Sequence, residues 1–183
     1  MENINYIVKQ SIAGNAKQQR ALYEMHRTRW FMLCLRYGKN KAQAEDIFQE
    51  GLIQVFKDLK QYDASKAGFS TWSSRVLINA ALKYLKKFNW INNFEDLSIA
   101  DQIEDNSHDV FDVLSASELT FYIQNLPLGY KIVFNMYAIE GYSHKEIADT
   151  LGITVGTSKS QLSKARKELR KKLESHFKLS PHG

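Results

Sequence analysis

The stretch YSHKEIADTLGITVGTSKSQLSKARKEL, Tyr142 to Leu169, determines how the C-terminal part of the chain folds. Ser143 and Glu146 have the spacing of a capping box, in which each side chain satisfies a backbone N–H of the first helical turn. Gly152 can end that helix in a left-handed conformation, and Thr154 can cap a second helix. The pattern therefore predicts two helices that are joined by a turn of about four residues.

The second of these helices has two chemically different faces. Its inward stripe recurs every three or four residues and comprises Ser158, Leu162, Ala165, Leu169 and Leu173. The opposite face and its flanks are basic and rich in donors: Lys159, Ser160, Gln161, Ser163, Lys164, Arg166, Lys167, Arg170 and Lys171. Such a helix fits a DNA major groove, where some side chains meet base edges and others meet phosphates. A solvated helix of an ordinary bundle is the alternative.

Composition limits the class of protein. A chain of 183 residues with 44% apolar residues can form one ordinary domain or two small ones with buried cores. The single cysteine, Cys34, excludes an intramolecular disulfide and a multi-cysteine metal site, which fits a reducing cytoplasm. No signal-peptide pattern is visible, and the longest apolar runs, such as WFMLCL, are far too short to span a membrane. We expect a soluble cytoplasmic protein without membrane insertion.

The net charge of +5 is distributed in three blocks. Residues 1–87 contain 15 basic and 7 acidic residues, and residues 131–183 contain 10 and 5. Between them, residues 88–130 contain 8 acidic residues and neither Lys nor Arg. Two basic blocks suggest two polyanion-binding modules. The acidic residues concentrate in 92–112, which lacks helical periodicity and indicates a linker, with an acidic loop packed on one domain as the alternative.

Helical periodicity dominates both basic blocks. Helices are expected near residues 4–13, 16–37, 41–59 and 70–88, and then near 115–125, 128–140, 144–151 and 155–174. The sequence therefore predicts an all-α protein of two small helical domains. We place the first at residues 1–91, the acidic linker at 92–112 and the second domain at 113–183.

An acidic face interrupts the first basic block. In KAQAEDIFQEGLIQVFKDL, Lys41 to Leu59, the polar residues one turn apart on a largely exposed side are Glu45, Asp46, Gln49 and Glu50. Carboxylates would repel phosphate, so this face fits a basic protein partner better than nucleic acid. A solvated face is one alternative. A Mg²⁺-dependent nuclease using Glu45, Asp46 and Glu50 is another, but it lacks a companion His or Asp cluster.

The segment FSTWSSRVLINAALKYLKKFNW, Phe69 to Trp90, mixes cations, amides and aromatic rings. Ser70 is expected to cap its helix, and one polar stripe comprises Arg75, Asn79, Lys83, Lys86 and Lys87. Single-stranded DNA suits this mixture, because bases stack on rings while cations follow the backbone. Trp72 could be a stacking platform or a core residue. The preceding loop of small residues, 62–68, could shape a pocket for one extruded base.

Three motifs in this order resemble the extracytoplasmic-function (ECF) sigma factors of bacterial RNA polymerase. AEDIFQE and GFSTWSSRVLINAALKYLKK resemble region 2 of that family, and LPLGYKIVFNMYAIEGYSHKEIADTLGITVGTSKSQLSKARKEL resembles region 4. With the amphipathic stretch ALYEMHRTRWFMLCLRYG, they cover most of the chain outside the linker and the termini. Each motif is weak alone, whereas their joint order and spacing are specific.

The resemblance implies a division of labour between the two domains. Residues docking on the β′ clamp helices of core polymerase would be Glu45, Asp46, Gln49 and Glu50. Residues capturing the -10 strand would be Ser70, Trp72, Arg75, Asn79, Lys83 and Lys86. Residues reading or holding the duplex -35 element would be Thr157, Lys159, Ser160, Gln161, Ser163, Lys164, Arg166 and Lys167.

Further expectations follow from the same resemblance. The polymerase β flap and promoter DNA are expected partners, and an anti-sigma factor is an expected regulator. Chemistry would belong to the polymerase, so we expect no enzyme activity, metal or cofactor in this chain. Departures from the family pattern occur at Gly51, which could soften its helix, and at Ser158 and Gln161, which could lower phosphate affinity. A stand-alone helix-turn-helix regulator that binds duplex operators without polymerase is the competing function.

Overall fold

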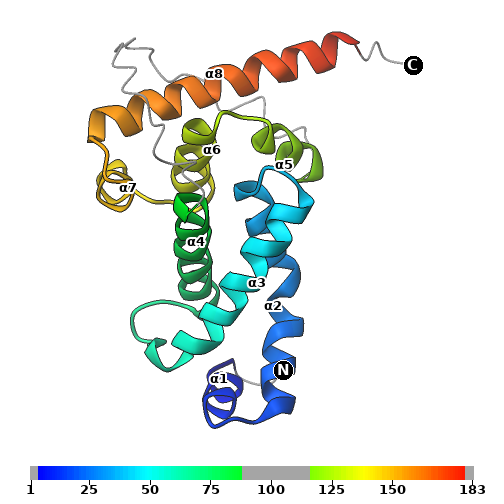
Figure 1. The fold of residues 1–183 in the computed structure, drawn as a ribbon, viewed down its shortest axis with the longest axis vertical. Helices are drawn as coiled ribbons and strands as arrows, with labels where there is room; N and C mark the ends of the chain where they lie inside the picture. The colour runs from blue at the N-terminus through cyan, green and yellow to red at the C-terminus, as the bar shows by residue number, and fades with distance from the viewer. Residues whose placement is uncertain (1–3, 88–115, 180–183) are drawn as a thin grey trace. The chain divides into compact units, whose positions relative to one another are not determined.

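The computed structural model describes residues 4–87 and 116–179, and the chain divides into two compact units between Phe88 and Asn89. Regular structure in the described residues is helical, so the all-α prediction is confirmed (Figure 1). The first unit contains α1 (Ile4–Ile12), α2 (Ala16–Tyr37), α3 (Lys41–Asp58), a 3₁₀ turn (Leu59–Gln61) and α4 (Phe69–Lys87). The second contains α5 (Ala116–Gln124), α6 (Leu128–Phe134), a π-helical turn (Asn135–Ile139), α7 (His144–Leu151) and α8 (Val155–Leu179).

The predicted linker, residues 92–112, lies outside the described residues. The predicted domain bounds 1–91 and 113–183 therefore stay predictions. Among the described helices, none is both long and apolar enough to cross a lipid bilayer.

The core of the first unit lies where α2, α3 and α4 pack together. Its fully buried side chains include Leu22, Trp30, Ile47, Leu77 and Leu85. The indole Nε1 of Trp30 donates a hydrogen bond of 3.0 Å to the hydroxyl of Ser73, which ties α2 to α4. Burying these apolar surfaces supplies the main driving force that holds the three helices together.

Gly51 lies where α3 packs against α4. A Cβ at this position would lie 2.5 Å from Cδ2 of the fully buried Leu77. Atoms at that distance overlap, so a side chain at position 51 would force Leu77 or the helix backbones to shift. The sequence suggested only that Gly51 softens its helix, whereas the structure gives it a role in packing.

The start of α4 differs from the prediction. We expected Ser70 to cap this helix, but α4 begins at Phe69 and Ser70 lies inside the first turn. The carbonyl of Gly68 accepts the first intrahelical bond, from the N–H of Trp72 at 3.0 Å. Phe69, the first residue of the helix, is buried in the core. Gly68 rather than Ser70 thus occupies the cap position.

In the second unit, α8 packs against α6 and α7. The core of this unit is formed by Ile132, Met136, Ile147, Leu162 and Leu169. The helix expected at 128–140 is α-helical only as far as Phe134. Beyond that residue it widens into the π-helical turn, in which Glu140 N–H donates to the carbonyl of Asn135 at 3.0 Å.

Candidate nucleic-acid and partner interfaces

Local interactions build the turn between α7 and α8 as the sequence predicted. The Ser143 hydroxyl accepts from the N–H of Glu146 at 3.2 Å, and the Glu146 carboxylate accepts from the N–H of Ser143 at 2.8 Å. Gly152 ends α7 with a φ of +71°. Thr154 Oγ1 then accepts from the N–H of Thr157 at 3.0 Å and caps α8. The predicted helix-turn-helix is therefore confirmed.

A cluster around His144 fixes α8 against α7. Its Nδ1 lies 2.9 Å from the hydroxyl of the fully buried Ser158, and its ring stacks on Tyr137 with centroids 4.4 Å apart. The Arg166 guanidinium lies 6.0 Å from the centroid of the same tyrosine ring. Burial lowers the pKa of His144, and the charges of Lys159 and Arg166 lower it further. Ser158 is tolerated in the core because its hydroxyl has this partner.

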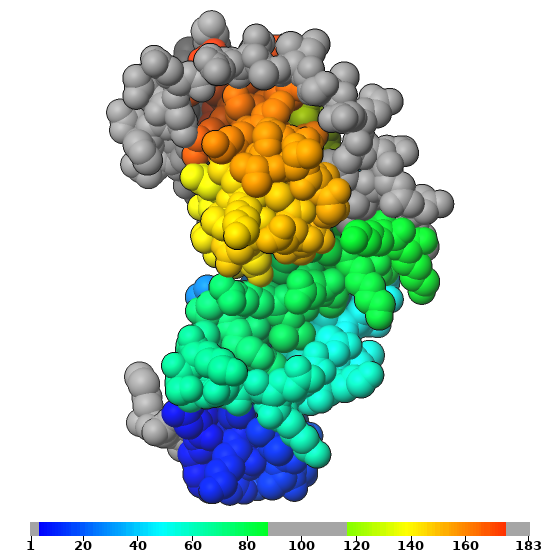
Figure 2. All heavy atoms as spheres, turned by 90° about the vertical axis from the view of Figure 1, so that its left-hand side faces the viewer, coloured from blue at the N-terminus to red at the C-terminus, as the bar shows by residue number. Residues whose placement is uncertain are grey.

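The predicted DNA-facing residues of α8 differ in exposure. Lys159 and Lys167 are exposed. In the space-filling view, α7 and the first part of α8 reach the surface of their unit side by side (Figure 2). The half-buried members of the set are Thr157, Ser160, Ser163, Lys164 and Arg166.

Gln161 departs from the prediction. Its side chain is only 9% exposed, and its Oε1 is buried without a hydrogen-bond partner. Gln161 comes three residues after Ser158 and four before Ala165, so the helical period turns it toward the same inward stripe. It therefore does not present its amide on the exposed face of α8, and we remove it from the candidate DNA contacts.

A stripe of polar side chains runs along α4. Arg75, Asn79, Lys83 and Lys86 are all exposed and recur every three or four residues. Such spacing places three cations and one amide along a single face, where they can follow a polyanionic backbone. Ser70 is half-buried near the start of the same helix.

Aromatic rings gather beside the N-terminal end of α4. The half-buried Trp72 lies 5.6 Å, between ring centroids, from both Phe69 and Tyr62. Phe69 also lies 5.0 Å from His26 of α2, whose pKa is lowered by burial and by the charge of Arg29. The ring of Trp72 is thus part of an aromatic cluster and keeps some exposed surface, so its role in stacking a base stays a prediction.

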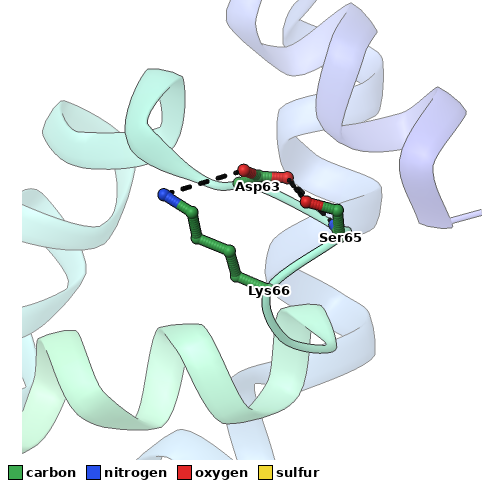
Figure 3. A network of polar contacts seen from close by, with 3 residues as sticks. All are labelled: Asp63, Ser65 and Lys66. Atoms are coloured by element: carbon green, nitrogen blue, oxygen red, sulfur yellow. Dashed lines mark hydrogen bonds and ion pairs between the residues drawn. The ribbon is translucent and has the colours of Figure 1, made fainter.

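The loop before α4 is held by its own side chains (Figure 3). One oxygen of Asp63, Oδ1, accepts from the N–H of Ser65 at 2.9 Å and from its hydroxyl at 2.7 Å. The other oxygen lies 3.8 Å from the ammonium of Lys66. The bonds from Ser65 hold the pKa of the Asp63 carboxyl below its usual range. The loop therefore keeps a defined shape beside the aromatic cluster.

The acidic face of α3 is exposed as predicted. Glu45, Asp46, Gln49 and Glu50 are all exposed along one side of the helix. We call these four residues the acidic face. The Lys41 ammonium lies 3.8 Å from the Glu45 carboxylate, and both side chains reach solvent. In the part of the chain that the structure describes, no group of three His, Cys, Asp or Glu side chains could hold a metal ion.

Ile53 is a surface residue that was not predicted from the sequence. It is 69% exposed, the largest exposed fraction among the large hydrophobic side chains that reach the surface of the described residues. It follows Gln49 and Glu50 by one helical turn, so it continues the acidic face with an apolar side chain. The signal was present in the sequence, because positions 46, 49, 50 and 53 fall on one side of an α-helix.

Two family models match the chain. The model described as Sigma-70 region 2 matches residues 22–91, and the model described as Sigma-70, region 4 matches residues 117–169. ECF RNA polymerase sigma factor SigW of Bacillus subtilis is 28% identical over 177 residues, which cover 91% of this chain and 94% of the relative. ECF RNA polymerase sigma factor SigE of Mycolicibacterium smegmatis is also 28% identical, over 85% of this chain and 61% of the relative.

Solved structures show the same fold. CnrH in complex with the cytosolic domain of CnrY has a TM-score of 0.50 at 18% identity and covers 93% of this chain and 96% of its own. The sigma factor RpoE of Bartonella quintana, crystallised with the anti-sigma factor NepR, has a TM-score of 0.54 at 16% identity, covering 87% and 98%. The fold and both matched regions define a sigma factor. The chain belongs to the sigma-70 family, and the two relatives named above are ECF sigma factors.

Proposed function

We propose that the chain binds the core of bacterial RNA polymerase and directs it to specific promoters. In this proposal the acidic face of α3 docks on the polymerase, α4 captures the -10 strand, and α8 reads the duplex -35 element. The observation that carries the proposal is the exposed acidic face inside a basic unit. A domain that only bound DNA would gain nothing from carboxylates that repel phosphate.

The acidic face fits a basic helical partner. Charges at Asp46 and Glu50 attract cations and set the orientation of the encounter. Ile53 at the end of this face can lose water when the partner closes over it, which adds apolar contact to a charged rim. The family to which the chain belongs suggests the β′ clamp helices as this partner, with the β flap as a second polymerase contact.

The polar stripe of α4 supports capture of a melted strand. Opening one base out of the duplex costs a few kcal/mol, which binding in a preformed pocket can offset. The loop held by Asp63 and the ring of Trp72 lie beside that stripe and can receive an unstacked base. Arg75, Asn79, Lys83 and Lys86 would then follow the strand, with Ser70 near its entry.

The exposed face of α8 supports duplex recognition. Four of its residues are suited to base edges, and three are suited to phosphates. We assign Lys159, Ser160, Ser163 and Lys164 to the first set, and Thr157, Arg166 and Lys167 to the second. Each unit alone binds DNA weakly, and joining both to one polymerase raises their effective concentration at a promoter.

Regulation and location follow from the family. Two similar solved structures are complexes, one with an anti-sigma factor and one with the cytosolic domain of CnrY. We propose that an anti-sigma factor also controls this chain and that it acts in the cytoplasm. Phosphodiester chemistry belongs to the polymerase in this proposal, and the chain itself needs neither metal nor cofactor.

Charge reversal on the acidic face tests the proposal. Asp46→Lys, alone and with Glu50→Lys, should weaken binding of the full chain to core polymerase by about 10-fold or more, because attraction becomes repulsion. Binding to duplex DNA at low salt should not fall. Glu24→Lys is a matched control for the single variant, since this exposed α2 residue lies outside the acidic face and makes the same change of net charge.

The same experiment distinguishes the proposed function from the competing one, a stand-alone helix-turn-helix regulator. A stand-alone regulator would bind its duplex operator tightly without polymerase and would keep that activity after charge reversal. If the double variant binds polymerase as the unchanged chain does, the acidic face is not a docking surface and the proposal fails.

A further inference from the structure

A hydrogen bond joins the acidic face to the neighbouring helix. The Tyr84 hydroxyl of α4 donates to Oδ2 of Asp46 on α3 at 2.9 Å. Tyr84 is 8% exposed, whereas Asp46 lies at the surface. A buried phenol therefore holds one oxygen of an exposed carboxylate. Residues 46 and 84 are 38 positions apart, and no sequence motif couples them.

We propose that Tyr84 is a positioning residue for polymerase docking: its hydroxyl holds the Asp46 carboxylate in the orientation that a cation of the polymerase meets. This inference rests on the proposed function, because it assigns a second residue to the same docking surface. Tyr84 itself does not touch the polymerase in this account. It acts by reducing the number of conformations that Asp46 can adopt before binding.

The physical basis is preorganisation. An exposed aspartate samples several rotamers, and fixing it in an interface costs entropy that lowers affinity. A carboxylate has two oxygens and several acceptor sites, so one bond to Tyr84 leaves room for a charged partner. A bond already present in the free protein removes part of the cost of ordering.

The donor role of Tyr84 is secure across the neutral pH range. Burial raises the pKa of its hydroxyl, the hydrogen bond to Asp46 raises it further, and so do the charges of Asp46 and Glu50. The phenol therefore keeps its proton and donates to the carboxylate. Glu45 is restrained less, because the ammonium of Lys41 lies 3.8 Å from its carboxylate and both side chains are exposed.

A purely structural role for Tyr84 is the competing explanation, since the residue is only 8% exposed and its hydroxyl bond joins α4 to α3. Tyr84→Phe keeps the ring and removes only the hydroxyl, which makes it the variant of choice. Thermal unfolding of the full chain shows whether the variant is folded. A second test variant, Asp46→Ala, removes the group through which Tyr84 is proposed to act.

The experiment is a double-mutant cycle on the affinity of the full chain for purified core polymerase. We expect Tyr84→Phe to raise the dissociation constant by about 3- to 10-fold, the range for losing one preordered side chain. In the Asp46→Ala background, Tyr84→Phe should change the dissociation constant by less than about 1.5-fold, because the group through which Tyr84 acts is already absent. Tyr6→Phe is the matched control, because this exposed α1 tyrosine lies in the same unit.

Each outcome has a distinct meaning. Unchanged affinity of Tyr84→Phe, or the same loss with and without Asp46, overturns the positioning role and leaves the proposed function standing. No loss for Asp46→Ala overturns the docking surface, and the positioning role falls with it. A loss for Tyr84→Phe that vanishes in the Asp46→Ala background supports both.

Discussion

At the scale of single residues, Gly51 leaves room for the Leu77 side chain where α3 packs against α4. Gly51→Ala gains about 1 kcal/mol of helix propensity but forces a Cβ against Leu77, and overpacking of a core costs about 1–3 kcal/mol. We expect a net loss of about 1 kcal/mol, which lowers the unfolding midpoint of the first unit by about 4–8 °C. Calorimetry of the full chain measures this shift.

Gly68 provides the control for that prediction. No atom lies within 4 Å of the position that its Cβ would occupy, so Gly68→Ser adds a Cβ without overlap and keeps a residue that is favourable at an N-cap. Its effect on the free energy of unfolding should stay within about 0.5 kcal/mol. Equal midpoints for the Gly51→Ala chain and the unchanged chain would show that Leu77 yields without cost.

His144 makes the stability of the second unit depend on pH. Burial and nearby charges hold its pKa below the value of about 6.5 expected in the unfolded chain. As the pH falls through about 6.5, the unfolded state therefore binds more protons than the folded state, and stability is lost. The contribution of His144 to the free energy of unfolding is fully present above that pH.

An asparagine at this position is the test. His144→Asn cannot titrate but can still bond the Ser158 hydroxyl. Between about pH 7.5 and 5.5, on either side of the ordinary histidine pKa, the unfolding midpoint should fall less in the variant than in the unchanged chain. His26, whose pKa is also lowered, is present in both proteins and cancels in the comparison. An identical fall in both would remove His144 as the cause.

Most residue-scale predictions that depend on neighbours in sequence succeeded. The capping box and the Gly152 cap were both correct, whereas the Ser70 cap, although equally local, was wrong. The bonds from Tyr84 to Asp46 and from His144 to Ser158 were not predicted, because they form only after helices pack. We predicted that Gln161 faces DNA, but its side chain is buried. The residue lies at the edge of an apolar stripe, where packing rather than periodicity decides which way a side chain points.

At the scale of helices, periodicity predicted which segments are helical but not where each begins and ends. α2 and α7 agree with the prediction at both ends, whereas α8 continues to Leu179 beyond the expected 174. The start of α4 and the π-helical turn after Phe134 are features that hydrophobic periodicity does not report. Boundary differences of this kind leave the faces of the helices unchanged.

The recognition role of α8 is tested at Lys164. If Lys164 reads a base edge, Lys164→Ala should cost about 1–3 kcal/mol of binding free energy and relax sequence preference at one position. Lys145→Ala is the control, because Lys145 is an exposed lysine of α7 and lies outside α8. If Lys145 contacts phosphate, its loss should weaken binding to all promoter sequences equally. Binding of full chain plus polymerase to a panel of single-base promoter variants measures both. A uniform loss for Lys164→Ala would make it a phosphate contact.

At the scale of the whole molecule, the charge pattern of the sequence alone predicts two modules. The division into two units at residue 88 lies at the end of the first basic block. Both matched regions fall within these units, except that the region 2 match continues to residue 91. The charge pattern does not predict that the apolar side chain of Ile53 is exposed, nor which promoter sequence is bound. It therefore indicates the class of protein and not its target.

Transcription by purified core polymerase from a library of random promoter sequences tests the central claim most directly. Addition of the full chain should produce defined start sites, each preceded by the same pair of -10 and -35 sequences at a constant spacing. Asp46→Lys/Glu50→Lys should abolish these transcripts while the variant stays folded. A folded chain that neither binds core polymerase nor selects any start site would contradict the account.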